Sequence, residues 1–273
     1  VTEYWIKNFD IDGWRMDVAK ELDFSFWKDF RDIALNAKKD VVLISEIFGD
    51  TSQWLQGDRF DGTMNYSFRE TMVDFFATKR INNKEFANSL SNLYSMYSFE
   101  ALSSCQNLLS SHDVRRFLNQ CESNTDGIYG AVFLQATFPG IAGIYYGDEI
   151  GLGGGGDPFN REPFPWDSED KWNKELMEFT TDLMNIKIGE PILKYGHFQM
   201  IKFDDDYVIF RRKLNNESLL CIVNRDKCTK DIEIETKAEN VELIYGECSI
   251  ELKSGNLILK DLAENFGLII KET

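Results

Sequence analysis

The sequence predicts an α/β region over residues 1–190, followed by a smaller all-β domain over residues 191–273. Two observations support this prediction. In the first region, short apolar runs alternate with stretches whose apolar residues recur at helical spacing, which is the pattern of βα units and a parallel sheet. From Gly196 onward the pattern changes to short alternating runs between turn residues, which is typical of an antiparallel β-sandwich.

The α/β region is expected to hold five βα units. Their predicted strands are Ile11 to Asp17, Val41 to Glu46, Phe60 to Tyr66, Asn107 to Ser111 and Ile141 to Tyr146. The predicted helices are Phe24 to Lys38, Phe68 to Arg80, Lys84 to Tyr97, Ile128 to Phe138 and Lys171 to Ile188. The last helix should end before Gly189-Glu190-Pro191, because glycine and proline stop a helix and begin a linker.

The all-β domain is predicted from six short runs. These are Tyr207 to Lys213, Leu219 to Val223, Asp231 to Glu235, Val241 to Tyr245, Leu257 to Leu259 and Gly267 to Ile270. Turn residues such as Asn215-Asn216 and Ser254-Gly255-Asn256 separate the runs. A small antiparallel sandwich is therefore expected.

Composition excludes several classes of partner. The net charge is −16, so phosphate backbones and anionic membrane surfaces would be repelled, and neither nucleic acid nor a membrane is expected as a partner. The longest apolar runs fall short of the 18 residues that a membrane-spanning helix needs.

Cysteine and histidine usage argues against a metal centre. The cysteines are odd in number and lack C-x-x-C spacing: Cys105, Cys121, Cys221, Cys228 and Cys248. We interpret them as free thiols in a reducing cytoplasm. With only two histidines, no His/Cys zinc site can be assembled at the usual spacings, and metal catalysis is not expected.

Three acidic residues stand where predicted strands end: Asp17, Glu46 and Asp113. In a parallel sheet the carboxyl ends of the strands meet at one edge, where working residues gather. Arg15 and Asp17 are two apart on one strand and share a face. A guanidinium there lowers the pKa of the carboxylate and keeps it ionised, as a nucleophile requires. An ordinary buried ion pair is the alternative that these two residues leave open.

Four motifs in chain order resemble the α-amylase superfamily, glycoside hydrolase family 13. They are Asp12-Gly13-Trp14-Arg15-Met16-Asp17-Val18-Ala19-Lys20-Glu21, Ile44-Ser45-Glu46-Ile47-Phe48, Ser111-His112-Asp113 and Tyr145-Tyr146-Gly147-Asp148-Glu149-Ile150-Gly151. They cover the first ~190 residues, and four motifs in the same order are specific to this family.

The resemblance implies the C-terminal part, strands 4 to 8, of a TIM (β/α)8 barrel over residues 1–190 and a C-terminal β-sandwich domain over 191–273. The nucleophile strand of this family is the fourth, and 16 residues before Asp17 leave no room for three earlier strands. A truncated chain, a proteolytic product or a partial gene is therefore expected. It should be inactive alone, with an open barrel edge that favours a homodimer or other self-association.

The resemblance also implies the roles of the acidic residues. Asp17 would attack the anomeric carbon, and Glu46 would protonate the leaving oxygen and later activate water. Asp113 with His112 would bind the hydroxyls of the distorted sugar, completing a retaining mechanism. The pKa of Glu46 should then be raised and that of Asp17 kept low. Because His112 and Asp113 are adjacent, they cannot share one face of a regular strand, which should bend or end near Ser111.

The subgroup most similar is that of neopullulanase, cyclomaltodextrinase and maltogenic amylase, on the basis of Glu21, Phe60 to Tyr66 and Gly156 to Arg161. The expected substrate is an α-glucan oligosaccharide with α-1,4 bonds, and cleavage of α-1,6 bonds is left open. The residues expected to bind it are Arg15, Lys20, Glu21, Phe48, His112, Asp157 and Arg161. No cofactor is expected, and calcium in the full-length enzyme would take its usual ligands from outside this chain.

Two alternatives stay open on the same scaffold. A glucanotransferase or isomerase shares the glycosyl-enzyme intermediate with a hydrolase and differs in the acceptor that reaches it. A catalytically inactive amylase-like binding protein would keep the fold without the chemistry, although such proteins lack parts of the acidic set that is present here.

Three weaker signals are interpreted conservatively. The run Gly151 to Gly156 satisfies G-x-G-x-x-G, but Pro158 follows too soon for the helix of a dinucleotide site, which favours a substrate loop. The consecutive residues Ser111-His112-Asp113 cannot form a serine-protease triad. Trp54 and Phe48 follow Glu46, and stacking on sugar and packing in the core are equal alternatives for both.

Overall fold

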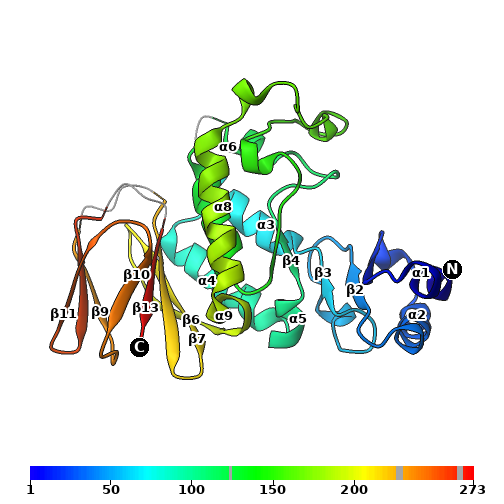
Figure 1. The fold of residues 1–273 in the computed structure, drawn as a ribbon, viewed down its shortest axis with the longest axis horizontal. Helices are drawn as coiled ribbons and strands as arrows, with labels where there is room; N and C mark the ends of the chain where they lie inside the picture. Colours follow the sequence, from blue (N-terminus) through cyan, green and yellow to red (C-terminus); the bar gives the residue numbers. More distant parts are fainter. Residues whose placement is uncertain (123–124, 226–229, 263–266) are drawn as a thin grey trace.

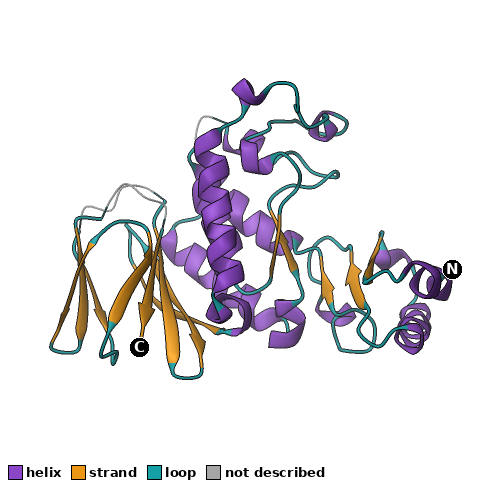
Figure 2. Cartoon of the chain, viewed as in Figure 1, coloured by secondary structure: helices purple, strands orange, loops and turns teal. Residues whose placement is uncertain are grey.

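A computed structural model describes residues 1–122, 125–225, 230–262 and 267–273. Along its longest axis the chain runs from a small N-terminal group of helices and strands, through a central group of helices, to two antiparallel sheets (Figure 1). Helices and the short parallel strands fill the first two parts, and the third is almost entirely strand (Figure 2). Helices with short parallel strands thus come first in the chain and antiparallel strands last, and the predicted domain boundary after residue 190 remains a prediction.

Five short parallel strands follow one another in chain order. They are β1 (Gly13–Met16), β2 (Val42–Ser45), β3 (Gly62–Thr63), β4 (Gln106–Leu108) and β5 (Ile141–Gly143). The first three form one sheet, the last two form another, and a parallel bridge between Met64 and Gln106 links the two sheets. All five predicted strands exist, and within the described residues they do not close into a barrel.

Each parallel strand is shorter than predicted, and the largest correction concerns Phe60 to Tyr66. Its second half does not continue as strand because Asn65 caps the next helix, α3 (Tyr66–Met72): the Asn65 side chain accepts a hydrogen bond from the backbone N–H of Phe68. A π-helical turn, Val73–Ala77, extends α3, so the predicted helix begins and ends earlier than expected.

The remaining helices are α1 (Thr2–Phe9), α2 (Phe24–Ala37), α4 (Asn83–Met96), α5 (Phe99–Ser103), α6 (Phe117–Cys121), α7 (Gly127–Thr137), α8 (Lys174–Gly189) and α9 (Pro191–Tyr195). Their starts follow local chemistry. Asn82 and Glu85 form a reciprocal capping box at α4, and the Asn173 side chain caps α8. The sequence did not predict α1, α5, α6 and α9, each of eight residues or fewer.

Two antiparallel sheets make up the C-terminal part. The strands are β6 (His197–Phe203), β7 (Val208–Leu214), β8 (Glu217–Val223), β9 (Ile232–Glu235), β10 (Val241–Tyr245), β11 (Ser249–Lys253), β12 (Asn256–Lys260) and β13 (Leu268–Glu272). One sheet has the order β10-β13-β8-β7-β6 and the other β11-β12-β9. The sandwich prediction is confirmed, although the sequence analysis missed β6 and β11.

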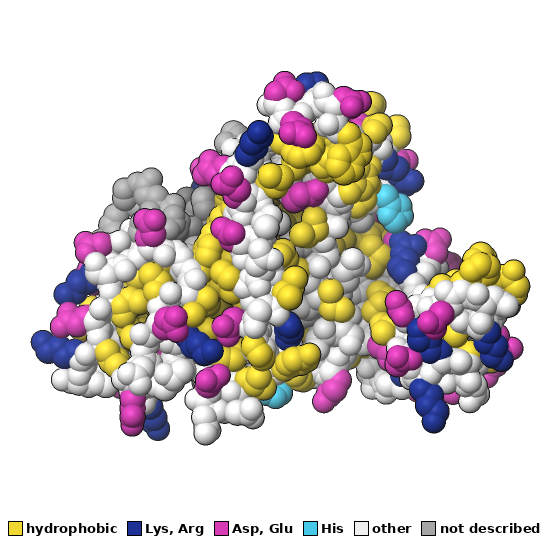
Figure 3. Space-filling model, in the orientation of Figure 1, with side chains coloured by type: hydrophobic (Ala, Val, Ile, Leu, Met, Phe, Trp, Pro, Cys, Tyr) yellow, Lys and Arg dark blue, Asp and Glu magenta, His cyan; other side chains and the backbone are white. Residues whose placement is uncertain are grey.

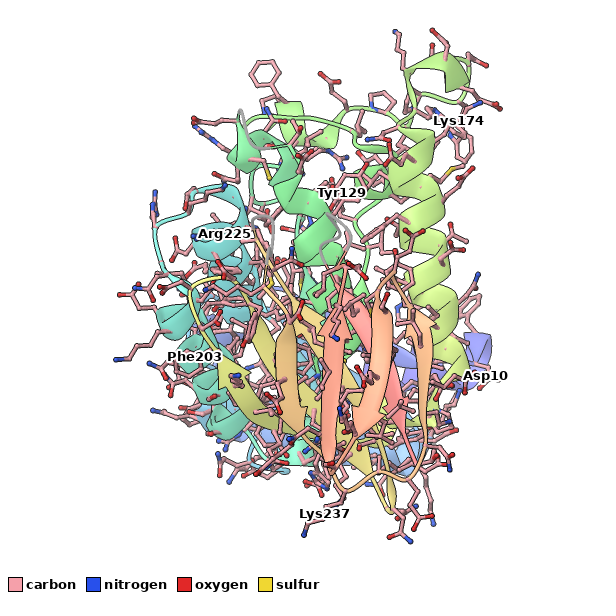
Figure 4. The ribbon with its side chains drawn as sticks, turned by 90° about the vertical axis from the view of Figure 1, so that its left-hand side faces the viewer. Asp10, Tyr129, Lys174, Phe203, Arg225 and Lys237 are labelled. Atoms are coloured by element: carbon pink, nitrogen blue, oxygen red, sulfur yellow. The ribbon has the colours of Figure 1, made fainter. Side chains whose placement is uncertain are left out.

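The five-stranded sheet is covered on both faces because its side chains alternate. Phe210 of β7 and Leu219 of β8 face the helices, whereas Ile209 and Leu220 face the second sheet. Viewed from the sandwich end, the sheets lie in front of α7 and α8, with Lys174 of α8 at the top and Lys237 at the opposite end (Figure 4). The sequence therefore builds a helix, sheet and sheet stack.

Two buried cations lie in the helical layer and where it meets the sandwich: Arg212 joins β7 to the helices, and Lys187 joins α8 to α7. The Arg212 guanidinium of β7 donates to the backbone oxygens of Leu193 and Gly196 at 3.0 and 2.7 Å. The Lys187 ammonium of α8 donates to the oxygen of Ala136 at 2.9 Å. Among the described residues neither cation has a carboxylate partner, and burial lowers the pKa of Lys187 to about 7.

The cysteines that the structure describes are free thiols, as expected, and Cys228 lies outside the described residues. Burial raises the pKa of Cys105, Cys121 and Cys221 to about 12, which keeps these thiols protonated and unreactive at neutral pH. In the described part of the chain, none of the helices combines the length and the apolar character that crossing a membrane requires.

Candidate active site

The three predicted carboxylates come together at one edge of the parallel strands. Asp17 follows β1 by one residue, Glu46 follows β2 by one residue, and Asp113 lies in the turn after β4. One side-chain oxygen or nitrogen atom from each of Glu46, His112 and Asp113 lies within 4.8 Å of the other two. The parallel pairing of β1 with β2, Met16 opposite Ser45, brings Asp17 beside Glu46. The convergence predicted from the strand ends is confirmed.

Arg15 connects the two central carboxylates. Its Nη1 lies 2.7 Å from Asp17 Oδ1, and its Nη2 makes a close contact with Glu46 Oε1. The alternation of side chains along β1 places Arg15 and Asp17 on one face, and the register of β1 with β2 brings Glu46 to the same guanidinium. The predicted ion pair between Arg15 and Asp17 exists, and the same guanidinium also contacts Glu46.

Glu46 is the buried acid of the group, with its side chain 5% exposed. Burial raises its pKa to about 7, although the backbone N–H of Val18 and the charge of Arg15 pull in the opposite direction. The Val18 N–H donates to Glu46 Oε2 at 3.3 Å, which requires a left-handed backbone at Val18, with φ of 43°. Such a backbone is strained for a β-branched residue, and strain of this kind gathers at functional sites.

Asp17 lies in the opposite environment. Its side chain is 73% exposed, and the hydrogen bond from Arg15, followed by one with Glu46, lowers its pKa. Two neighbouring carboxyl groups thus have pKa values pushed apart, so that near neutral pH Glu46 is protonated in a substantial fraction of molecules while Asp17 is ionised. That is the arrangement by which a pair of carboxyl groups divides acid and nucleophile roles.

His112 and Asp113 form the third part of the site. Strand β4 ends at Leu108, so both residues lie in a turn, as their adjacency required. His112 Nε2 lies 3.0 Å from Asp113 Oδ2, and the Asp113 backbone N–H donates to Ser111 Oγ at 3.2 Å. Both side chains stay partly exposed, which leaves them available to a ligand.

The loop that follows β5 reaches this turn through Arg161. Its Nε donates to the His112 oxygen at 3.0 Å and lies 2.8 Å from Asp157 Oδ1, while its Nη2 lies 3.6 Å from Asp113 Oδ1. Arg161 and Asp157 therefore lie at the site, and they contact protein groups within it. Substrate contact by either remains a prediction.

The other predicted binding residues lie around the edge. Lys20 and Glu21 are exposed on the short helix that follows Asp17, and their contact with substrate remains a prediction. One ring face of Phe48 is stacked on Tyr66 at 3.8 Å, so a sugar could use only the opposite face. Trp54 packs edge-on against Phe24 at 5.2 Å and belongs to the core.

A metal is not favoured at this cluster, even though Glu46, His112 and Asp113 have suitable ligand atoms. The guanidinium of Arg15 already contacts Glu46, and its fixed positive charge opposes a cation there. The absence of a cofactor therefore remains our expectation.

A cavity of about 670 Å³ lies elsewhere, at one end of the sandwich. Its walls include Arg211 and Glu272, which bind each other through two contacts of 2.7 and 3.0 Å. Because this pair of charges is already satisfied and the carboxylate cluster at the strand ends combines two acids with opposite pKa shifts, that cluster is the better candidate site. Figure 3 shows a histidine, basic side chains and acidic side chains beside the notch between the central and N-terminal parts of the surface.

Comparison with known proteins points to one family. Residues 1–187 match the alpha-amylase catalytic domain. A cyclomaltodextrinase of Thermoanaerobacter pseudethanolicus is 37% identical over 275 residues, covering 99% of this chain and 46% of that enzyme. Neopullulanase 2 of Thermoactinomyces vulgaris is 41% identical over 187 residues, 68% of this chain and 32% of that enzyme.

A solved structure shows the same fold. The native debranching enzyme of Nostoc punctiforme is 30% identical and superimposes with a TM-score of 0.90, covering 100% of this chain and 60% of that one. The chain thus spans about half the length of the curated relatives that it matches.

Proposed function

Because this chain belongs to the alpha-amylase family, we propose that its strand ends carry the catalytic carboxylates of a retaining glycosidase acting on α-1,4 bonds of maltooligosaccharides, cyclodextrins or pullulan. One observation carries the proposal. Glu46, with a pKa raised to about 7, and Asp17, with a lowered pKa, share the guanidinium of Arg15. Names of relatives such as cyclomaltodextrinase and neopullulanase support the substrate class.

In this proposal Asp17 attacks the anomeric carbon while the bond to the leaving sugar oxygen breaks. Glu46 gives its proton to that oxygen, and the sugar stays on Asp17 as an ester. Glu46, now ionised, takes a proton from water, whose oxygen attacks the anomeric carbon and releases Asp17. His112 and Asp113 bind ring hydroxyls and favour the distorted sugar of the transition state.

The described residues supply five parallel strands and no closed barrel. We therefore propose that activity belongs to a polypeptide in which these residues are joined to a segment that supplies the remaining strands, named here the barrel-complete enzyme. The 273 residues alone should be inactive, because catalytic groups need positions fixed to a fraction of an ångström. A cytoplasmic location also remains a prediction.

Asp17→Asn in the barrel-complete enzyme tests the function. The variant should fold, and kcat on a maltooligosaccharide should fall more than about 100-fold, a barrier increase of ~2.7 kcal/mol, because an amide cannot form the glycosyl ester. Product analysis by mass separates hydrolysis from transfer to a sugar acceptor. A variant that keeps more than about one hundredth of wild-type kcat would rule out the assigned role.

Self-association is proposed for the 273-residue chain. Strand β1 pairs only with β2 among the described strands, and Val42 of β2 is 41% exposed. At the other end of the parallel strands, Ile141 of β5 and the nearby Ile144 are 49% and 42% exposed. An unpaired edge and uncovered apolar residues favour pairing with a second copy. Light scattering should show a dimer or larger species for this chain, with a maltooligosaccharide assay run beside it. A monodisperse monomer with ordinary enzymatic rates would overturn both proposals about the isolated chain.

A further inference from the structure

The turn that carries His112 and Asp113 has little backbone support of its own. Strand β4 ends at Leu108, four residues before His112, so the sheet ladder does not fix this segment. Its internal contacts are the long bond from the Val114 N–H to the Ser111 oxygen, 3.4 Å, and the bond from the Asp113 N–H to Ser111 Oγ. A turn held in this way needs outside contacts to keep the Asp113 carboxylate in place.

Asn160 supplies three of these contacts from the loop after β5, in addition to the Arg161 bond to the His112 oxygen and the Tyr66 contact with Ser111 Oγ. Its side chain is fully buried, and its Nδ2 lies 3.3, 2.8 and 2.9 Å from the backbone oxygens of Ser111, His112 and Val114. A carboxamide nitrogen carries only two hydrogens, so at least one of them is shared between two oxygens. A single side chain thus binds the carbonyls that surround His112 and Asp113.

The backbone of Asn160 is itself held in place. It lies in the short 3-10 helix Phe159–Arg161, and a side chain at Gly154 would meet the Phe159 oxygen at 2.6 Å and the Asn160 Cα at 2.9 Å. Only glycine permits that approach. The Tyr145 hydroxyl donates to the Asn160 oxygen at 3.4 Å. The loop is therefore built to bring Asn160 against the turn.

We propose that Asn160 is a positioning residue for catalysis, which acts by holding the Ser111–Val114 turn so that Asp113 and His112 face the glycosidic bond beside Glu46. This inference rests on the proposed function and assigns Asn160 no contact with substrate. Its effect should fall on the transition state, because Asp113 and His112 bind the distorted sugar more tightly than the relaxed one. A displacement of about 1 Å at such a group can cost about 100-fold in rate.

The test is Asn160→Ala in the barrel-complete enzyme. We expect kcat on a maltooligosaccharide to fall by about 10- to 100-fold with little change in KM, because ground-state binding elsewhere is untouched. Asn119→Ala is the matched control. Asn119 accepts a bond from the Gly154 N–H in the same loop, is exposed, and does not contact the turn. It should leave kcat within about twofold of wild type.

A double-mutant cycle separates positioning from general stability. In an Asp113→Asn background, adding Asn160→Ala should cost much less than it costs alone, because the group that it positions is already lost. Equal fold-losses in the two backgrounds would overturn the inference. If the alanine variant does not fold, Asn160→Asp keeps the shape, and its protonated form offers one donor. As pH rises, the new carboxyl group loses its proton and with it the donor, so the ratio of variant kcat to wild-type kcat should fall. A ratio that stays constant with pH would count against the proposal.

Hydrogen exchange on the isolated chain makes failure of this inference distinguishable from failure of the proposed function. Asn160→Ala should speed exchange of the Asp113 and Val114 amides, with Asn119→Ala again as control. If the wild-type barrel-complete enzyme lacks glycosidase activity while exchange changes as expected, the proposed function fails. If the enzyme is active and Asn160→Ala changes neither exchange nor kcat, this inference fails alone.

Discussion

Strands of similar composition end in very different surroundings at the two ends of this molecule. On β7 of the five-stranded sheet, Val208 and Ile209 point to opposite faces and both are fully buried. On β2, Leu43 is fully buried against the helices on one face, whereas Val42 on the other is 41% exposed. The five-stranded sheet has a layer on each face, whereas among the residues that the structure describes only one layer covers the parallel strands β1 and β2.

The difference shows that an apolar run specifies a strand without specifying what covers it. β7 is covered by helices and a second sheet that the same chain supplies, so its packing is complete. The face of β2 that carries Val42 has no such layer within the described residues, and the candidate catalytic carboxylates lie at the carboxyl end of this strand. The stability of this chain should therefore depend on packing around the five-stranded sheet. The proposed glycosidase activity should depend on a further layer that covers the exposed face of β2.

The largest effect is expected from Phe210→Ala in the five-stranded sheet. Phe210 is fully buried and packs against Phe198 with ring centroids 5.3 Å apart. Removing its ring should lower the free energy of unfolding by about 3–5 kcal/mol, because the lost burial adds to the cost of a cavity. Urea denaturation of the isolated chain measures this. A loss below about 1 kcal/mol would contradict complete packing on this side.

A pH effect follows from the buried Lys187 on the same side. Its pKa is about 7 in the folded chain and near its ordinary 10.5 when unfolded, so above pH 7 the unfolded state binds more protons. Stability contributed by this group should rise with pH, by at most about 1.4 kcal/mol per unit. Wild type and Lys187→Met should be denatured between pH 7 and about 8, below the ordinary cysteine pKa of about 8.5, and the difference in stability between them should shift in favour of wild type as pH rises.

On the open side, the titration of Glu46 should affect activity. Glu46, which we propose as the proton donor, has a pKa of about 7 and loses its proton as pH rises through that value. The kcat/KM of the barrel-complete enzyme should then fall about tenfold per unit above pH 7. The lowered pKa of Asp17 should move the acid limb below the ordinary range of aspartate. A profile flat to pH 9 would show that Glu46 is not the acid.

The smallest effect is expected from Val42→Ala. In the isolated chain it should change the free energy of unfolding by about 0.5 kcal/mol or less, because much of this side chain is already in water. In the barrel-complete enzyme the same change should cost about 1 kcal/mol or more, as at a covered core position. Equal costs in both forms would mean that no further layer covers this face.

Local chemistry let the sequence predict most of the elements. Apolar periodicity predicted the five parallel strands, and helical spacing and stop signals predicted α2, α4, α7 and α8. The alternation of β7 and β8 predicted the sandwich. The same reasoning located Asp17, Glu46 and Asp113, because strand ends in a parallel sheet meet at one edge.

Tertiary structure decided what depends on distant partners. The sequence marked Asn160 only as part of the run Gly156 to Arg161 and gave it no role of its own, because its contacts are with carbonyls 46 to 49 residues away in the chain. The pKa of Glu46 is set by burial and that of Lys187 by the layers that enclose it, and neither is encoded in its neighbours along the chain. A sequence pattern records which residues prefer an apolar environment, and only the packed layers decide which of them obtain it.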